Sequence, residues 1–404
     1  MPVSYILRPY QKEAVEAAVS YLKSESKHNA IEVLPTGAGK ALVIANVAKE
    51  LGAPTLVFQP SKEILEQNHE KLRSYGYDAS IYSACMGQKE ISHITFATIG
   101  STFRKADLFK EFQYVIVDEC HGVNPKKGMY SSFLKQLNGT RVLGLTATPY
   151  RLVTDGFGGS ILKFLTRTRP RVFHDVIYYV QNRVLLKAGF LAKLRYSSPV
   201  NFDRSRLKLN STGADFDDQS VKNYYRDSKF PDMVVDVITR EMGTRRNALV
   251  FTRFVEEAEY LVSRVPGAAI VTAETPKAER EKLISGFRSG QIKVICNVGI
   301  LVLGFDYPEL ETIIIAAPTM SLARFYQMIG RGIRPHPAKE YTEVVDMCGN
   351  LKLFGRVEDL RLVNGGNGKW FISSNGRQLT NIYYGQRPHG GVGDGERTVD
   401  FRKS

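Results

Sequence analysis

Cysteine and long apolar runs are scarce in this 404-residue chain, and each shortage excludes a class of protein. There are four cysteines, and no two of them form a C-x-x-C pair, so we expect reduced thiols and no zinc site. The longest apolar runs, such as 313–317, are far too short to cross a bilayer. Residues 1–10 lack a basic segment followed by a long apolar stretch, which predicts no signal peptide and a cytoplasmic location.

Acidic residues are also in short supply. The chain has 41 Asp and Glu against 55 Lys and Arg, which leaves a formal net charge of +14. This excess favours a polyanionic partner, most often nucleic acid, with simple solubility as the alternative. The composition, 43% hydrophobic and 24% charged, is typical of a soluble chain with about two or three domains. Tryptophan occurs once, and we expect Trp370 to pack against the second domain rather than to stack on a base.

The most informative stretch is 31–41, with the sequence IEVLPTGAGKA. Its apolar residues predict a short strand over 31–34, its small residues predict a turn, and a helical pattern follows over 42–51. Strand, glycine-rich turn and helix are the context of a phosphate-binding loop, although a structural turn remains the alternative for such a loop by itself. Backbone N–H groups would cradle phosphate oxygens, and Lys40 would reach the β- and γ-phosphates.

Two carboxylates are placed to complete a nucleotide site. Strand and helix patterns alternate through the first part of the chain, which predicts a parallel sheet with ligands at the carboxyl ends of its strands. Asp118 and Glu119 directly follow an apolar run at 114–117. There Asp118 would hold Mg²⁺, and Glu119 would act as the general base for the attacking water. Ala41 stands where such loops carry Ser or Thr, so the hydroxyl that binds Mg²⁺ is missing.

Six short motifs follow one another along the chain. They are LRPYQ at 7–11, PTGAGK at 35–40, DECH at 118–121, TAT at 146–148, GFD at 304–306 and QMIGRGIR at 327–334. Together they resemble the motif set of the superfamily 2 helicases and translocases, over roughly residues 7–363. Within that superfamily, VLLKAGFLA at 184–192 is similar to a segment of the branch that contains the XPB repair helicases and the phage-encoded UvsW-type branch-migration helicases.

The resemblance implies an α/β fold with two RecA-like, P-loop parallel-sheet lobes in tandem, a small accessory insert and a C-terminal tail. The expected boundaries are 1–150 for the ATP-binding lobe 1, 151–230 for a basic connector, 231–363 for lobe 2 and 364–404 for a glycine-rich tail. Within the connector, the polar stretch 201–227 is expected to hold a flexible link between the lobes. In the tail, the Ser-Asn-Gly sequence predicts a small hairpin.

In such a motor, ATP and Mg²⁺ bind between the two lobes. Gln11 offers an amide that can both donate to and accept from an adenine edge. The residues expected to contact ATP are Arg8, Gln11, Pro35, Thr36, Gly37, Ala38, Gly39, Lys40, Ala41, Gly304 and Asp306. Arg331 and Arg334, three residues apart on one expected helical face, would recognise the γ-phosphate and supply an arginine finger, with Gln327 beside them.

Nucleic acid, most of all branched or duplex DNA, is the expected partner. The resemblance implies a backbone-tracking groove lined by Gln59, Pro60, Ser61, Thr98, Gly100, Thr252, Arg253 and Gly299. Between 159 and 195, eight basic residues and one acid are interleaved with aromatic residues, which indicates phosphate contacts and base stacking. This set includes Arg167, Arg169 and Arg171. The alternative is a solvated connector whose aromatic side chains pack inward.

Three other functions stay open on the sequence. An RNA helicase would use the same motifs, and the motor subunit of a restriction complex would need a nuclease partner. A nucleic-acid-binding protein that hydrolyses ATP weakly would fit Ala41 together with Val302 and Leu303, which replace the Thr, Ser or Glu that the family usually carries there. The resemblance implies a phage or bacterial type of protein in each case.

Overall fold

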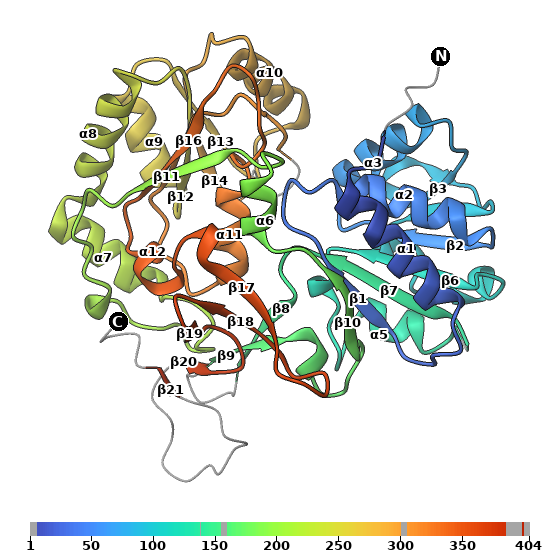
Figure 1. Cartoon of the computed structure of the whole chain (residues 1–404). Helices are drawn as coiled ribbons and strands as arrows, with labels where there is room; N and C mark the ends of the chain where they lie inside the picture. Colours follow the sequence, from blue (N-terminus) through green and yellow to red (C-terminus); the bar gives the residue numbers. More distant parts are fainter. Residues whose placement is uncertain (1–5, 138, 155–159, 300–304, 385–397, 400–404) are drawn as a thin grey trace. The chain divides into compact units, whose positions relative to one another are not determined.

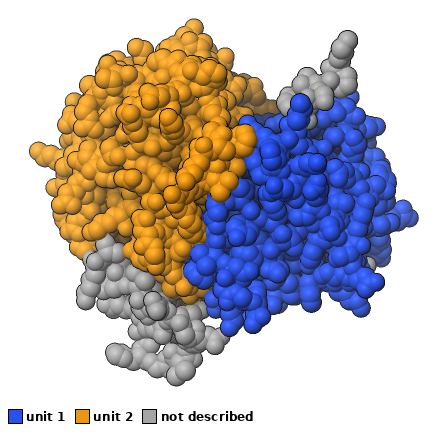
Figure 2. Space-filling model, viewed as in Figure 1, with its two compact units in different colours: residues 1–151, 163–181, 362–372 blue, residues 152–162, 182–361, 373–404 orange. Residues whose placement is uncertain are grey.

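The computed structural model describes residues 6–137, 139–154, 160–299, 305–384 and 398–399. The chain forms two compact units, which Figure 1 shows as ribbons and Figure 2 colours blue and orange. Unit 1 comprises residues 1–151, 163–181 and 362–372, and unit 2 comprises residues 152–162, 182–361 and 373–404. Each unit contains its own largely parallel sheet, so the expected α/β fold with two parallel-sheet lobes is confirmed.

Unit 1 is built on an eight-stranded sheet in the order β10-β1-β7-β6-β2-β5-β3-β4. Its strands are β1 (Ala30–Val33), β2 (Thr55–Phe58), β3 (Ser80–Ser83), β4 (Gln88–Lys89), β5 (Ile94–Ala97), β6 (Tyr114–Asp118), β7 (Arg141–Thr146) and β10 (Asp175–Tyr179). Its helices are α1 (Pro9–Lys23), α2 (Lys40–Leu51), α3 (Lys62–Ser74), α4 (Ile99–Thr102) and α5 (Met129–Leu134). Only β4 is antiparallel to its neighbour.

The central strands of this sheet are mostly apolar on both faces, with Glu32 of β1 as a buried charged exception. Every residue of β1, β2 and β5 is buried, as expected for parallel strands covered by helices. Helices α1 and α2 pack against each other over these strands (Figure 1). Ser61 caps α3 by accepting a hydrogen bond from Ile64 N at 3.3 Å. Because β1, β2, β5, β6 and β7 are parallel, the residues at their carboxyl ends lie along one edge of the sheet.

Unit 2 is built on a six-stranded, all-parallel sheet in the order β11-β16-β15-β12-β14-β13. Its strands are β11 (Lys193–Ser197), β12 (Ala248–Thr252), β13 (Ala268–Val271), β14 (Val294–Val298), β15 (Thr312–Ile315) and β16 (Tyr341–Asp346). Its helices are α6 (Asn182–Lys187), α7 (Asp218–Ser228), α8 (Phe230–Met242), α9 (Val255–Arg264), α10 (Lys277–Arg288), α11 (Leu322–Ile329) and α12 (Asn350–Phe354).

Two small sheets complete the described chain. One has the order β17-β18-β19, and the other has the order β21-β20-β9-β8. Their strands are β8 (Tyr150–Thr154), β9 (Ser160–Phe164), β17 (Leu360–Asn364), β18 (Trp370–Ser374), β19 (Arg377–Gln378), β20 (Tyr383–Tyr384) and β21 (Thr398–Val399). Strands β18 and β19 pair antiparallel around Asn375 and Gly376, which both have positive φ, so the hairpin expected at Ser-Asn-Gly is confirmed.

The stretch 201–227 is folded into unit 2 and is not the flexible link that its polar composition predicts. It contains the first ten residues of helix α7, and its apolar residues Phe202, Phe216 and Tyr225 are buried. The Arg204 side chain is also buried, and its guanidinium donates to Thr319 O at 2.8 Å and to Cys348 O at 2.9 Å. The prediction is wrong because these partners lie more than a hundred residues away in the sequence.

Trp370 packs within unit 1, not against the second domain as expected. Its Nε1 donates to Asp175 Oδ1 at 2.6 Å, and its ring meets that of Tyr179 edge-on at 5.5 Å. Gln181 adds two bonds from the same part of the sheet, because its side-chain amide donates to Leu362 O and accepts from Leu362 N. The segment 362–372 is therefore part of unit 1 although it follows unit 2 in the sequence.

The four cysteines are all free thiols, and Cys85 is the exposed one. The other three are buried, as expected for thiols that serve as small apolar residues. Within the described residues, no helix combines the length and the apolar character needed to cross a membrane.

Candidate nucleotide site

The glycine-rich loop of unit 1 joins the end of β1 to the start of α2, as the sequence predicts. Gly37 and Gly39 have φ of 82° and 80°, a region that favours glycine. A Cβ at Gly39 would lie 2.5 Å from Gln11 Nε2, so a larger residue would displace that side chain. Ala38 N donates to Pro35 O at 3.1 Å, which closes the turn. The loop ends at Lys40, the first residue of α2.

Gln11, the residue expected to recognise adenine, is bonded to this loop. Its Nε2 donates to Ala38 O at 2.8 Å, and its Oε1 accepts from Arg8 N at 2.9 Å. Tyr10 donates to the same Ala38 carbonyl at 2.8 Å. The sequence did not single out Tyr10, whose only signal is its place between Arg8 and Gln11. Adenine recognition by Gln11 stays a prediction, and it would require the amide to exchange these partners.

Lys40 and Glu119 form an ion pair at the carboxyl edge of the sheet. Lys40 Nζ lies 3.3 Å from Glu119 Oε1, and both side chains are largely buried. Glu119 has φ of 49° and ψ of 50°, a left-handed conformation that costs a non-glycine residue about 1–2 kcal/mol. Strain of this kind persists where the surrounding structure fixes it, most often at functional sites.

The neighbouring carboxyls of Asp118 and Glu119 have opposite proton affinities. Burial, followed by the negative charge of Glu119, raises the pKa of Asp118 to about 7. Burial acts on Glu119 as well, but the charge of Lys40 and the hydrogen bond with His121 outweigh it and lower the pKa of Glu119 below its usual range. Glu119 is therefore the carboxylate that carries the charge, and Asp118 titrates near neutral pH.

Asp118 suits a magnesium ion that arrives with a nucleotide. Its Oδ1 accepts from Glu119 N at 2.9 Å, while Oδ2 has a contact of 3.5 Å with Asn68 Nδ2. Within the described residues no group of three or more His, Cys, Asp or Glu could hold a metal without further ligands. Mg²⁺ usually takes one or two carboxylates, with phosphate oxygens and waters as its other ligands, so this donor set fits.

His121 and Thr146 hold the other oxygen of Glu119, and Thr148 contacts both of them. Thr146 Oγ1 donates to Glu119 Oε2 at 3.2 Å, and His121 Nδ1 lies 3.2 Å from the same oxygen. His121 Nδ1 also lies 3.0 Å from both threonine hydroxyls. The two threonines belong to the TAT motif at 146–148. His121 was not proposed as a site residue, although it closes the DECH motif two residues after Glu119.

In unit 2 the structure brings together the GFD motif and the two predicted finger arginines. Arg331 Nη1 donates to Phe305 O at 2.8 Å, and Arg334 forms an ion pair with Asp306. Gly304, the remaining expected ATP contact, lies outside the described residues. Gln327, in the last turns of α11, is half-buried.

The expectation that the two arginines share a helical face is wrong. Helix α11 ends at Ile329, and both arginines lie in the turn that follows. A Cβ at Gly332, between them, would lie 2.5 Å from Thr342 Cγ2, so this turn packs tightly against the sheet. The helix stops because the chain must approach β16 at a glycine.

Two conserved domains match the chain in succession. Residues 4–151 match the family described as type III restriction enzyme, res subunit, and residues 230–336 match the helicase conserved C-terminal domain. The first contains the glycine-rich loop and Glu119, and the second contains Arg331 and Arg334. These two matches are the paired domains of superfamily 2 helicases, in the order that the motifs predict.

Curated relatives are similar to this chain over most of its length. A 51.5 kDa protein of Lactococcus phage (isolate 7-9) is 27% identical over 310 residues, which cover 74% of this chain and 61% of the relative. The DNA 3'-5' translocase XPB2 of Sulfurisphaera tokodaii is 28% identical over 362 residues, 81% of this chain and 78% of the relative. The chain spans about half to three fifths of the first curated relatives that it matches.

The solved structure of an ATP-dependent Type ISP restriction-modification enzyme, LlaBIII bound to DNA, shares the fold. The two structures align with a TM-score of 0.62 at 16% identity. The alignment covers 85% of this chain and 28% of the restriction enzyme. This likeness concerns the fold, since the sequences have diverged widely.

The groove residues expected in unit 1 of this helicase differ in exposure. Pro60 and Ser61 follow β2 and Thr98 and Gly100 follow β5, so they lie at adjacent strand ends. Thr98 Oγ1 lies 2.9 Å from Ser101 Oγ, and a Cβ at Gly100 would meet open space. Gln59 is 1% exposed, so its expected contact with nucleic acid would require movement. The other four stay predicted contacts.

Asn68 on α3 connects that buried glutamine to Asp118, the carboxyl predicted to bind Mg²⁺. Its Nδ2 donates to Gln59 Oε1 at 2.9 Å and lies 3.5 Å from Asp118 Oδ2. Asn68 was not predicted as a site residue, because nothing in the sequence distinguishes a single asparagine within an amphipathic helix. The bond gives the strand-end motif after β2 a direct physical link to the nucleotide site.

The expected groove residues of unit 2 also lie at strand ends. Thr252 ends β12, is 1% exposed and donates to Asn297 O at 3.3 Å. Gly299 follows β14 with φ of 76°, and a Cβ there would meet open space. Arg253 is 10% exposed and is bonded on all sides within unit 2, as described below.

The basic stretch 159–195 divides between the units. Arg167 is half-buried, whereas Arg169 and Arg171 are exposed on unit 1. Of the interleaved aromatic residues, Phe164 and Phe173 are buried in the core. Inward packing therefore accounts for part of the aromatic content, and phosphate binding by the three arginines stays a prediction.

Restoring the missing hydroxyl tests the metal role of position 41. We expect Ala41→Thr to lower the Mg²⁺ concentration that half-saturates ATP hydrolysis by about fivefold, the effect of one ordinary polar interaction. Ala41→Val is the matched control, because valine has the same branched shape without the hydroxyl. Equal half-saturation in the Thr and Val variants would mean that water replaces the hydroxyl completely.

Proposed function

We propose that this superfamily 2 helicase is an ATP-driven DNA translocase that remodels branched DNA. The observation that carries the proposal is the cluster of Lys40, Glu119, His121 and Thr146 beside a glycine-rich loop. The net charge of +14 supports a nucleic acid as the track. DNA is favoured by the DNA 3'-5' translocase among the relatives. Branch migration is favoured by the similarity of residues 184–192 to a segment of the branch that contains both the XPB and the UvsW-type helicases.

The ion pair between Lys40 and Glu119 supports a hydrolysis mechanism in which the lysine exchanges partners. Lys40 would bind phosphate oxygens of ATP in place of Glu119 Oε1, while Thr146 continues to donate its hydrogen bond to Glu119 Oε2. Loss of the nearby positive charge raises the pKa of Glu119 and makes it a better base. Water then attacks the γ-phosphorus, the bond to the ADP oxygen breaks, and the proton of the water passes to Glu119. Bound Mg²⁺ would neutralise charge on the phosphates.

A restriction motor is the second candidate. The match of residues 4–151 to the res subunit of type III restriction enzymes favours it, and so does the fold of the Type ISP enzyme. Such a motor acts with a nuclease, so the two candidates differ in their partners. Stable co-purification of a nuclease would favour the restriction motor, and an active chain without one favours the translocase.

The translocase proposal is tested by the ATPase rate with four polynucleotides at equal phosphate concentration. We expect single-stranded and duplex DNA to stimulate hydrolysis, a four-way DNA junction to stimulate it most, and RNA to stimulate it least. Stimulation should fall steeply with salt, since phosphate binding displaces counterions. We also expect a four-way junction to be resolved faster than a tailed duplex of matched arm length is unwound.

Replacing Arg167, Arg169 and Arg171 with glutamine tests their role by comparing junction processing with the ATPase rate on single strands. If these arginines hold a second duplex arm, junction processing falls more than the ATPase rate on single strands. An equal loss in both assays would make them a general phosphate clamp. A rate indifferent to every polynucleotide would refute the motor, and an inert junction beside a rapidly opened tailed duplex would refute branch migration.

A further inference from the structure

Two arginines, Arg253 and Arg324, follow adjacent strands of the unit 2 sheet at their carboxyl ends. Arg253 comes directly after β12, and Arg324 lies in the first turn of α11, which follows β15. The expected groove residue Gly299 follows β14, the other neighbour of β12. The same edge of the sheet therefore carries both arginines and the predicted nucleic-acid contacts of unit 2.

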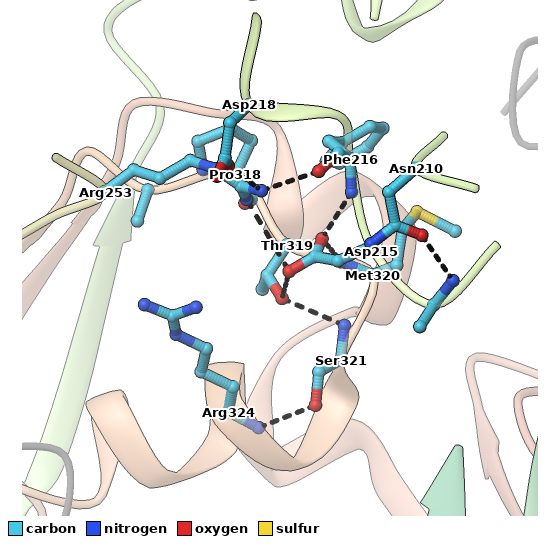
Figure 3. A network of polar contacts seen from close by, with 12 residues as sticks. Asn210, Asp215, Phe216, Asp218, Arg253, Pro318, Thr319, Met320, Ser321 and Arg324 are labelled. Atoms are coloured by element: carbon cyan, nitrogen blue, oxygen red, sulfur yellow. Dashed lines mark hydrogen bonds and ion pairs between the residues drawn. The ribbon is translucent and has the colours of Figure 1, made fainter. Parts of the chain in front are cut away.

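Arg253, the arginine expected to contact nucleic acid, is already saturated. Its Nη2 donates to Phe216 O at 2.7 Å and to Asp218 Oδ1 at 2.8 Å, and its Nη1 donates to Pro318 O at 3.1 Å. Asp215 Oδ2 lies 3.5 Å from Nη1 and also accepts from Thr319 Oγ1 (Figure 3). With a side chain only 10% exposed, Arg253 acts as a brace between the segment 215–218 and the loop before α11.

Arg324 lies beside this network without joining it through its guanidinium. Its backbone N donates to Ser321 Oγ at 3.2 Å, but no ion pair or hydrogen bond links its guanidinium to any described residue. Figure 3 shows the guanidinium pointing away from the network, with no dashed line reaching it.

The surroundings leave this cation in need of an acceptor. Burial lowers the pKa of Arg324, even though Asp215 and Asp218 act to raise it. Both carboxylates are bonded to Arg253, and neither forms an ion pair with Arg324 within the described residues. A partly buried guanidinium whose donors are open binds phosphate well, because its planar fork matches two phosphate oxygens.

We propose that Arg324, rather than Arg253, is the arginine of unit 2 that binds a backbone phosphate of nucleic acid. Ser321 Oγ accepts from Arg324 N, which leaves the hydroxyl proton free to donate to the same phosphate. This inference rests on the proposed function, because it takes the phosphate from DNA. A phosphate of ATP has the same chemistry and is the alternative source that the experiment separates.

The test is equilibrium binding of a fluorescent oligothymidylate of about 20 nucleotides, measured by anisotropy across a salt series. We expect Arg324→Ala to weaken binding about tenfold and to reduce the slope of log affinity against log salt by about 0.7, the loss of one contact on a single strand. Arg324→Gln keeps more of the side chain and should give the same reduced slope. It serves as the test if the alanine variant folds poorly. Affinity for a fluorescent ATP analogue should not change.

Arg240→Ala is the matched control. Arg240 is exposed, pairs with Glu241 at 3.2 Å and lies near the end of α8, which leads to the amino end of β12 on the opposite edge of the sheet. Its loss should leave the oligonucleotide affinity and the salt slope unchanged. An unchanged slope in both Arg324 variants, or a loss of ATP-analogue binding in place of oligonucleotide binding, would overturn the inference. Absence of oligonucleotide binding by the unaltered protein would instead refute the proposed function.

Discussion

Glu119→Gln should bind ATP as well as or better than the parent protein and hydrolyse it at least about a hundredfold more slowly. Glutamine keeps the size of the side chain and can still accept the bond from Thr146 Oγ1. It cannot accept the proton of the attacking water. It also releases Lys40 from its ion pair, so the lysine becomes free for the phosphates. Single-turnover hydrolysis and titration with a fluorescent ATP analogue measure the two effects separately.

The control for this substitution is Glu66→Gln, which removes a half-buried carboxylate of α3 that pairs with Lys62 at 3.7 Å. Hydrolysis by this variant should match that of the parent protein. If Glu119→Gln hydrolysed ATP at the parent rate, Glu119 would not be the general base. If it failed to bind the analogue, the carboxylate would instead be needed to shape the loop around Lys40.

Arg334→Ala should lower the hydrolysis rate at saturating ATP by about a thousandfold, the loss associated with an arginine finger. The reason is the charge that develops on the phosphoryl group in the transition state, which a guanidinium stabilises more than it stabilises the ground state. Binding of the ATP analogue and of oligothymidylate should change little. Arg334→Lys should recover only part of the rate, because an ammonium lacks the planar fork.

The present partner of Arg334 provides the discriminating comparison. Asp306→Asn removes the ion pair but leaves the guanidinium in place. If Arg334 acts on the phosphate, Asp306→Asn keeps most of the rate at saturating ATP. If the two substitutions reduce that rate equally, the role of Arg334 is to hold the GFD motif, and the finger assignment is wrong.

The candidate nucleotide site was predictable because each of its motifs is a short run of neighbouring residues. Strands β1 and β6 end at Val33 and Asp118, and the residues after them carry the loop and the proposed general base. Such features depend on a few neighbouring residues, so pattern and propensity identify them.

The rest depended on contacts between distant residues. Nothing beside Arg204 in the sequence indicates that Thr319 and Cys348 will accept its hydrogen bonds. The edge strands β10 and β11 contain tyrosines, lysine and arginine, and only the completed sheets show that they are strands. Saturation of Arg253 by Asp218 likewise cannot be read from the motif that contains the arginine.

The late position of Trp370 in the sequence affects the order in which the protein can fold. Strand β10 is the edge of the unit 1 sheet. Asp175 at its start bonds to Trp370, and Gln181 just after its end bonds to Leu362. Both partners belong to the segment 362–372. During synthesis these residues emerge only after nearly all of unit 2. Until then Asp175 and Gln181 lack these partners, and an uncovered sheet edge is a site for pairing with other chains. A nascent or truncated unit 1 without 362–372 therefore has an edge strand that lacks these contacts at both ends.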